Sequence, residues 1–319
     1  MAVYTEVTDD ALAAFLRDYA LGGAVAFKGI AEGVENSNYL LQTDRGSYIL
    51  TLYEKRVRQS DLPYFLSLMD HLAEQGFACP TPVHGRDGQA LRTLAGRPAA
   101  IVTFLPGVWP RSIDCGHCAE VGAAVARLHQ AGAGFTMQRP NDLSLAGWAD
   151  LAAACAAGAD TVRPGLARMI DDELSWLSQH WPADLPAGVI HADLFPDNVF
   201  FLDGRISGVI DFYFACNDFL AYDLAICLNA WCFNADHQFV AGRARRLMHA
   251  YGAVRPLSEA ETAAMPVLAR GSALRFLLTR LFDWLNHAPG AFVQPKDPLD
   301  YVARLAFHQT VAGPDAYGL

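Results

Sequence analysis

The sequence lacks the features that would place it outside the globular proteins. It has no apolar run near the ~18 residues that a membrane-spanning helix needs, and its start, MAVYTEVTDD, has none of the basic and apolar regions of a signal peptide. No repeat or low-complexity tract is visible along the 319 residues. These absences favour a globular protein of the cytoplasm that is long enough for about two domains.

Positive charge is also scarce. Lysine and arginine number 24 against 34 aspartates and glutamates, which gives a formal net charge of −10. The sequence offers no basic stripe, so it argues against a nucleic-acid partner. The 7 cysteines form an odd set without regular spacing, as expected for buried thiols in a reducing compartment. Cys115 and Cys118 form one C-x-x-C pair, but without a second pair we favour a structural role over a metal site.

Strand and helix patterns change character near residue 104, where the stretch LPGVWP breaks the regularity with two prolines and a glycine. We predict an α+β fold with two lobes: a small antiparallel β-sheet lobe over residues 1–104 and a larger, mainly helical lobe over residues 105–319. The helices predicted from apolar spacing cover residues 8–21, 61–75, 115–130, 145–157, 163–180, 218–233, 238–251 and 257–287.

One stretch interrupts the helical part. In VIHADLFPDNVFFLDGRISGVIDFYFA, residues 189–215, carboxylates lie next to apolar runs, where they are costly unless paired, solvated or bound to a cation. Asp203-Gly204 lies between two strand-like runs and predicts a tight hairpin. With a two-residue turn there, Asp211 lies diagonally across from Asn198, within the ~7–8 Å over which cross-strand side chains can share a ligand.

Asn198 and Asp211 supply oxygen donors that suit Mg²⁺, which takes one or two protein oxygens besides phosphates and water. His191, Asp193 and Asn198 also form H-x-D-x-x-x-x-N, the catalytic loop of kinase-like phosphotransferases, and Asp211 stands where their metal-binding D-F-G belongs. We therefore predict that Asp193 accepts the proton of an attacking hydroxyl and that Asn198 and Asp211 hold Mg²⁺. His191 is expected to brace the loop. The alternative is that these acids only decorate a solvated turn, as Asp203 does.

A nucleotide substrate would need a phosphate-binding loop in the first lobe. The segment from residue 28 to residue 39 joins two predicted strands and contains Gly33, Asn36 and Ser37, whose backbone N–H groups and small side chains are able to cradle phosphates. Thr103 and Leu105, at the lobe boundary, complete the predicted nucleotide site. The segment does not match G-x-G-x-x-G, and two glutamates within it would repel phosphate unless they point outward.

With these residues in view, the sequence resembles the aminoglycoside phosphotransferase and choline kinase superfamily. The resemblance lies in the Asp193 loop, in Asp211 and in NDFLAYDLA at residues 217–225, and it covers nearly the whole chain. Residues 209–233 and 270–286, with ILTLYEKR and PKDP, are similar to bacterial homoserine kinases of that superfamily. The resemblance implies a protein-kinase-like fold and, with Mg²⁺, phosphate transfer from ATP to the side-chain hydroxyl of homoserine, a step toward threonine.

Two features depart from the pattern of this superfamily. The third strand of kinase-like folds usually carries a Lys or Arg that reaches the α- and β-phosphates, but Thr51 occupies that position, and residues 62–72 lack the usual partner Glu. Losing both members avoids an unpaired buried charge. Lys28, Lys55 or Arg56 would then help Mg²⁺ to neutralise the phosphates.

Homoserine is a zwitterion, so its pocket needs a cation for the carboxylate and an acid for the ammonium group. Arg275 and Arg280, on a long apolar helix, and Asp218 are the predicted substrate-binding residues. Asp223 is instead expected to brace the catalytic loop. A competing interpretation pairs Arg280 with Asp283 at helical spacing for structure alone.

Two other functions stay open at this point. A kinase of the same superfamily could phosphorylate choline, an aminoglycoside or a sugar; a choline pocket would favour an aromatic cage, and an aminoglycoside pocket many exposed acids. Alternatively, Thr51 and the missing Glu would suit a catalytically inactive nucleotide-binding protein. Intact Asp193, Asn198 and Asp211 oppose that alternative, so we expect an active enzyme with a small-molecule substrate.

Overall fold

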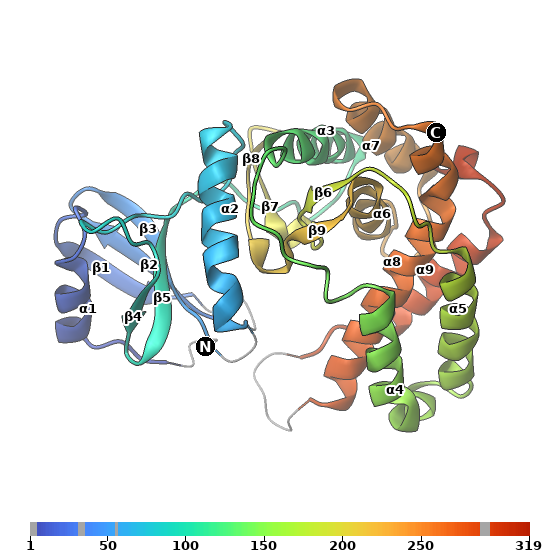
Figure 1. The fold of residues 1–319 in the computed structure, drawn as a ribbon, viewed down its shortest axis with the longest axis horizontal. Helices are drawn as coiled ribbons and strands as arrows, with labels where there is room; N and C mark the ends of the chain where they lie inside the picture. The colour runs from blue at the N-terminus through green and yellow to red at the C-terminus, as the bar shows by residue number, and fades with distance from the viewer. Residues whose placement is uncertain (1–4, 31–35, 55–56, 288–293) are drawn as a thin grey trace. The chain divides into compact units, whose positions relative to one another are not determined.

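The computed structural model describes residues 5–30, 36–54, 57–287 and 294–319, so Gly33, Lys55 and Arg56 lie outside the described part. The chain forms two compact units, whose elements are shown in Figure 1. Unit 1 comprises Met1–Gly107, Phe135–Met137 and Ser207–Tyr213, and unit 2 comprises Val108–Gly134, Gln138–Ile206 and Phe214–Leu319.

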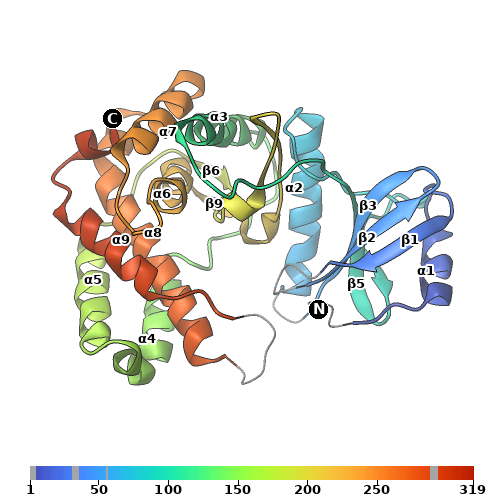
Figure 2. The same cartoon turned by 180° about the vertical axis from the view of Figure 1, so that it is seen from behind.

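Unit 1 contains a five-stranded sheet with helices on both faces. Its elements are α1 (Asp9–Leu16), β1 (Ala24–Gly29), β2 (Ser37–Thr43), β3 (Gly46–Leu52), α2 (Leu62–Glu74), β4 (Arg92–Leu94) and β5 (Arg97–Thr103). The strand order is β1-β2-β3-β5-β4, and every neighbouring pair is antiparallel. In both views the sheet lies between α1 and α2 (Figures 1 and 2).

A hydrophobic core fills the space between α1 and the sheet. Leu12, Phe15 and Leu16 of α1 pack in one cluster with Leu41 of β2 and Leu50 of β3. Helical spacing places the three α1 residues on one face, and every second residue of a strand points to the same side of the sheet. The apolar side chains of α1, β2 and β3 therefore form one core.

Unit 2 is mainly helical. Its helices are α3 (Cys115–Ala131), α4 (Leu145–Val162), α5 (Leu166–His180), α6 (Leu220–Trp231), α7 (Ala241–Val254), α8 (Glu259–Leu285) and α9 (Leu299–Thr310), and its short strands are β6 (Ala187–Ile190), β7 (Val199–Leu202) and β9 (Cys216–Phe219). α6 is the central helix, because every residue from Ala221 to Trp231 is buried; Figure 2 shows it end-on among its neighbours. No described helix is long and apolar enough to cross a membrane.

The predicted hairpin is confirmed. β7 and β8 (Arg205–Val209) form a two-stranded sheet, and the two residues between them, Asp203 and Gly204, have φ angles of 51° and 76°. Two successive positive φ angles are typical of the type I′ turn, which matches the twist of the strands and favours Asp-Gly.

The prediction of a helix that begins at residue 218 is wrong at its start. Residues Cys216–Phe219 form β9, which pairs antiparallel with β6, and α6 begins only at Leu220. The main-chain hydrogen bonds to β6 decide the conformation here, and helical periodicity does not register a partner strand that lies far away in the sequence.

Candidate active site

The predicted catalytic loop connects β6 to β7. It carries His191, Asp193 and Asn198, and it ends in a short 3-10 turn over Pro196–Asn198. The amide nitrogen Nδ2 of Asn198 donates to the main-chain oxygen of Asp193 at 2.8 Å and to its carboxylate Oδ2 at 3.2 Å. Because the nitrogen of the planar amide is used in this way, its oxygen Oδ1 faces the opposite side, where a cation is able to bind.

Asp223 of α6 supports the loop. Its two carboxylate oxygens accept the N–H groups of His191 and Ala192, both at 2.9 Å. Ala192 has a φ of 62°, which is unfavourable for a residue with a Cβ atom. The guanidinium of Arg275, which is 1% exposed, donates to the carbonyl oxygen of Ala192. Ala192 is thus held through both its N–H and its C=O, and these bonds stabilise the strained backbone beside Asp193.

A histidine from α3 completes this support. His129 places Nε2 3.3 Å from Oδ2 of Asp223 and Nδ1 2.9 Å from the hydroxyl of Tyr251. Burial acts to raise the pKa of Asp223, but the hydrogen bond and charge of His129, together with His191, outweigh it and hold that pKa below its ordinary value. Asp223 is therefore a buried carboxylate whose charge is matched by donors.

His191 belongs to the framework of the loop. The side chain is fully buried, and its Nδ1 accepts the N–H of Asp193 at 3.2 Å. The ring fixes the main chain at Asp193.

The carboxyl group of Asp193 has an unusual pKa. Burial raises it to about 6; the positive charges of Arg275 and Lys296 and the hydrogen bond from Asn198 oppose the rise, and the negative charge of Asp197 adds to it. A carboxylate whose pKa lies near neutral is suited to accept a proton during a reaction at ordinary pH.

Asp211 lies in unit 1, two residues after the end of β8. Its φ is 65°, again in the left-handed region. The residues around it pack within unit 1: the N–H of Val209 donates to the carbonyl oxygen of Ala78 at 3.0 Å, and the ring of Tyr213 meets Tyr53 edge-on with 5.4 Å between centroids. Burial is the main cause that raises the pKa of Tyr53, and the charge of Asp211 contributes. The backbone and this packing fix the position of Asp211 within unit 1.

Among the described residues, no group of three or more His, Cys, Asp or Glu side chains forms a metal site. The predicted Mg²⁺ site does not require one, because an amide and a carboxylate are sufficient when phosphates and water complete the coordination. The side chains of Asn198 and Asp211 each carry oxygen donors of the type that Mg²⁺ prefers.

The described side chains that were predicted to contact the nucleotide instead bond to or pack against other residues of unit 1. Ser37 donates its hydroxyl to the carboxylate of Glu54 at 2.8 Å, and Oδ1 of Asn36 accepts the N–H of Glu54 at 3.3 Å. The hydroxyl of Thr103 accepts a main-chain N–H at 2.9 Å, and Leu105 lies against the glycine of β8. Contacts from Asn36 and Ser37 to phosphate would therefore come from the backbone.

The third-strand position holds a neutral, buried side chain. Thr51 is 4% exposed and donates its hydroxyl to Oδ1 of Asn38, its partner on β2, at 2.8 Å. Lys28, one of the alternative cations, is exposed on β1 at the edge of the sheet.

The predicted substrate residues have protein partners. Asp218 accepts a hydrogen bond from Nδ2 of Asn141 at 2.7 Å. Nη1 of Arg280 donates to Oδ2 of Asp300 at 2.9 Å and to the carbonyl oxygen of Asp297 at 3.1 Å. The charge of Arg280 is thus held by a segment outside its own helix, and not by helical spacing alone.

Sequence reasoning passed over three side chains of this region, namely His129, Asn141 and Lys296. Nζ of Lys296 lies 3.3 Å from Oδ2 of Asp197. His129 and Asn141 belong to no motif that the sequence displays. Lys296 is part of PKDP, one of the stretches that carried the resemblance, and that was the available signal.

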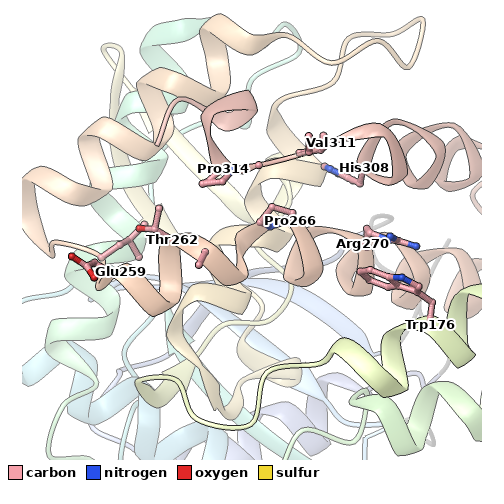
Figure 3. A pocket seen from close by; sticks show the side chains of 12 residues that line it. Trp176, Glu259, Thr262, Pro266, Arg270, His308, Val311 and Pro314 are labelled. Carbon is pink, nitrogen blue, oxygen red and sulfur yellow. The ribbon is translucent and has the colours of Figure 1, made fainter.

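Unit 2 also has a cavity of about 570 Å³ whose lining contains none of the predicted site residues (Figure 3). Arg270, on its wall, donates to Glu173 at 2.7 and 2.6 Å, and its guanidinium lies 3.4 Å from the ring centre of Trp176. The ring nitrogens of His308 bond to a tyrosine and an asparagine, and burial lowers its pKa to about 3. Arg270 and His308 thus each bond to other protein groups, so we assign no ligand to this cavity.

Sequence similarity to known proteins shows the family of this chain. The sequence profile of the phosphotransferase enzyme family matches residues 26–257. The chain belongs to this family. Its relatives within the phosphotransferase family include the homoserine kinase of Bradyrhizobium diazoefficiens, with 63% identity over 100% of this chain and 98% of the relative, and that of Rhodospirillum rubrum, with 61% identity over 100% and 99%.

Two solved structures share the fold of this chain. Amicoumacin kinase superposes with a TM-score of 0.69 at 16% identity, covering 94% of this chain and 91% of that chain. The choline kinase of Cryptosporidium parvum superposes with a TM-score of 0.64 at 15% identity, covering 89% and 88%. At these identities the likeness shows the fold alone, and it confirms the predicted two-lobed, protein-kinase-like α+β fold.

Proposed function

We infer that this chain catalyses the homoserine kinase reaction, in which the γ-phosphoryl group of ATP passes to the hydroxyl group of L-homoserine, a step toward threonine. The observation that carries this inference is the identity of 63% and 61% to homoserine kinases along the full length of the chain. A nucleoside triphosphate as co-substrate agrees with the amicoumacin kinase of the same fold, which was solved with AMP-PNP.

We propose Asp193 as the catalytic base. The hydroxyl oxygen of homoserine attacks the γ-phosphorus; the new O–P bond forms while the bond from this phosphorus to the β,γ-bridging oxygen breaks, and ADP leaves. The hydroxyl proton passes to the carboxylate of Asp193. Its pKa of about 6 suits a proton transfer that occurs late in the reaction. For His191, Asp223 and Arg275 we propose a positioning role, because each of them bonds to the main chain of the loop.

Asn198 and Asp211 are the proposed ligands of Mg²⁺. When bound, this ion neutralises charge on the β- and γ-phosphates. The amide of Asn198 already directs its nitrogen to Asp193, which leaves its oxygen for the ion. The proposed nucleotide contacts remain Gly33, Asn36, Ser37, Thr103 and Leu105, and the assignment of residues 1–104 as nucleotide-binding lobe and residues 105–319 as catalytic lobe also stays a prediction, as does a cytoplasmic location.

Release of ADP with a panel of alcohols tests the proposed function. With Mg²⁺ and ATP, we expect the highest kcat/KM for homoserine, and lower values for choline, an aminoglycoside and a sugar. Turnover should be lost in a chelator and in Asp211→Ala. A preference for choline or an aminoglycoside would replace the proposed substrate. Nucleotide binding without turnover of any alcohol would instead favour an inactive binding protein.

A further inference from the structure

An ion pair lies on the catalytic loop beside the proposed base. Nζ of Lys296 lies 3.3 Å from Oδ2 of Asp197, and the two side chains are 61% and 51% exposed. Asp197 is part of the 3-10 turn that ends the loop. The next residue of this turn, Asn198, donates to the carboxylate of Asp193 at 3.2 Å. The pair is therefore next to the place where the substrate hydroxyl must lie.

The backbone next to Lys296 is anchored although the lysine side chain is exposed. Arg280 of α8 donates to the carbonyl oxygen of Asp297 at 3.1 Å and to Oδ2 of Asp300 at 2.9 Å. The N–H of Leu299 donates to Oδ1 of Asp297 at 2.8 Å, where α9 begins. Asp297, the residue after Lys296, is thus fixed by these bonds, so the backbone holds the lysine at a defined position.

The ammonium group of Lys296 also has a defined aromatic neighbour. It lies 5.5 Å from the ring centre of Phe195, a residue of the catalytic loop, and that ring packs edge-on against Phe276 with 4.8 Å between centroids. A cation over an aromatic face gains about 0.5–1 kcal/mol at an exposed site. This contact favours a position of the Lys296 ammonium group beside the catalytic loop.

Other cations of this region are engaged in holding the main chain. Arg275 is buried and donates to the carbonyl oxygen of Ala192, and Arg304 donates to the carbonyl oxygen of Asn229. Arg280 holds Asp297 and Asp300. In the part of the chain that the structure describes, Lys296 by contrast pairs with the exposed carboxylate of Asp197, and exposed pairs of this kind contribute about 0–1 kcal/mol. Replacing Asp197 by another anionic partner of Lys296 therefore costs little free energy.

We propose that the pair Lys296–Asp197 recognises the zwitterionic end of the amino-acid substrate, with Lys296 binding the α-carboxylate and Asp197 the α-ammonium group. This inference rests on the proposed function. Two opposite charges that lie side by side are complementary to the two charges on the α-carbon of homoserine, and the short side chain of the substrate would place its hydroxyl beside Asp193. Binding exchanges one exposed ion pair for two charge-assisted hydrogen bonds.

Two analogues, each lacking one charge, test the pair. The analogue 3-amino-1-propanol lacks the carboxylate of homoserine, and 4-hydroxybutanoate lacks its ammonium group. We expect Lys296→Met to lower kcat/KM about 10- to 100-fold for homoserine and 4-hydroxybutanoate and less than about threefold for 3-amino-1-propanol. Asp197→Asn should give the crossed pattern, with losses for homoserine and 3-amino-1-propanol and almost none for 4-hydroxybutanoate.

Controls separate this inference from the proposed function. Lys296→Arg should restore much of the loss with homoserine. Arg168→Met removes an exposed cation from a helical ion pair on α5 and should leave every kcat/KM unchanged. Equal losses for all three alcohols, or a raised KM for ATP, would assign Lys296 to the phosphates and overturn the inference while homoserine turnover by the wild type still supports the proposed function. Absence of wild-type turnover of homoserine would overturn the proposed function itself.

Discussion

The catalytic loop of unit 2 and the third strand of unit 1 differ in how they use charge. Beside Asp193 the chain gathers charges of both signs, among them Asp223, Arg275 and Lys296, and the buried ones bond to main-chain groups. Thr51, where kinase-like folds usually place a cation, is neutral and bonds to a neighbouring amide. A buried charge is tolerated where several partners match it, and a neutral hydroxyl avoids the cost of burying one.

This difference between the catalytic loop and the third strand indicates where the reaction depends on charged side chains of the protein. In unit 2, a buried carboxylate and a buried guanidinium hold a strained loop, so removing either leaves unsatisfied groups in the interior. In unit 1, Thr51 on the third strand contributes a hydrogen bond to the neighbouring strand and no charge. Substitutions in the loop should therefore have much larger effects than substitutions at the third strand.

The largest effect is expected for the proposed base. Asp193→Asn should lower kcat for homoserine by about 10²–10⁴-fold, because the hydroxyl proton loses its acceptor. Steady-state release of ADP measures this loss. The matched control is Asp203→Asn in the turn between β7 and β8, where Asn tolerates the positive φ and activity should stay at the wild-type level. A wild-type rate for Asp193→Asn would remove Asp193 from the mechanism.

Removing the support of the loop should cost stability. Asp223→Ala leaves the N–H groups of His191 and Ala192 without their buried acceptor, so the free energy of unfolding should fall by about 3 kcal/mol, with a fall in kcat. Urea denaturation measures the change. Asp172→Ala, which removes an exposed acid of α5, should change the free energy of unfolding by less than about 0.5 kcal/mol. Similar losses in the two variants would contradict the supporting role of Asp223.

The pKa of Asp193 predicts a pH dependence. Because this pKa is about 6 and the base must be ionised, kcat/KM should fall about tenfold per pH unit below pH 6 and level off above it. The raised pKa favours the folded state at low pH, and this contribution is lost as the pH rises through 6. Asp193→Asn lacks it, so the stability of the variant relative to the wild type should be greater at pH 7 than at pH 4. An unchanged profile down to pH 4 would contradict the assignment.

The smallest effect is expected in unit 1. Thr51→Val removes the hydrogen bond to Asn38 and should lower the free energy of unfolding by about 1 kcal/mol, with kcat and the KM for ATP changed less than about threefold. Thermal or urea unfolding and nucleotide kinetics measure both quantities. A tenfold rise in the KM for ATP would show that the hydroxyl group takes part in phosphate binding, and the contrast between the two regions would then fail.

Much of the fold followed from local patterns. Alternating burial along β2 and the Asp203-Gly204 turn depend on residues that are close in the sequence. The helix predicted from residue 218 failed at its start, because β9 pairs with β6, whose residues lie far upstream. A short strand without alternation has no signal of its own, so only its partner reveals it.

For the site, the sequence alone determined which residues could do chemistry: the spacing of His191, Asp193 and Asn198, and their resemblance to a kinase loop. Only the tertiary structure decided what holds and surrounds them. Asp223 reaches Ala192 across 31 positions of the chain, Arg275 reaches it across 83, and Lys296 reaches Asp197 across 99. The physical reason is that periodicity shows which face of an element is buried, whereas the partner of a buried or charged group depends on which distant segment packs against that face.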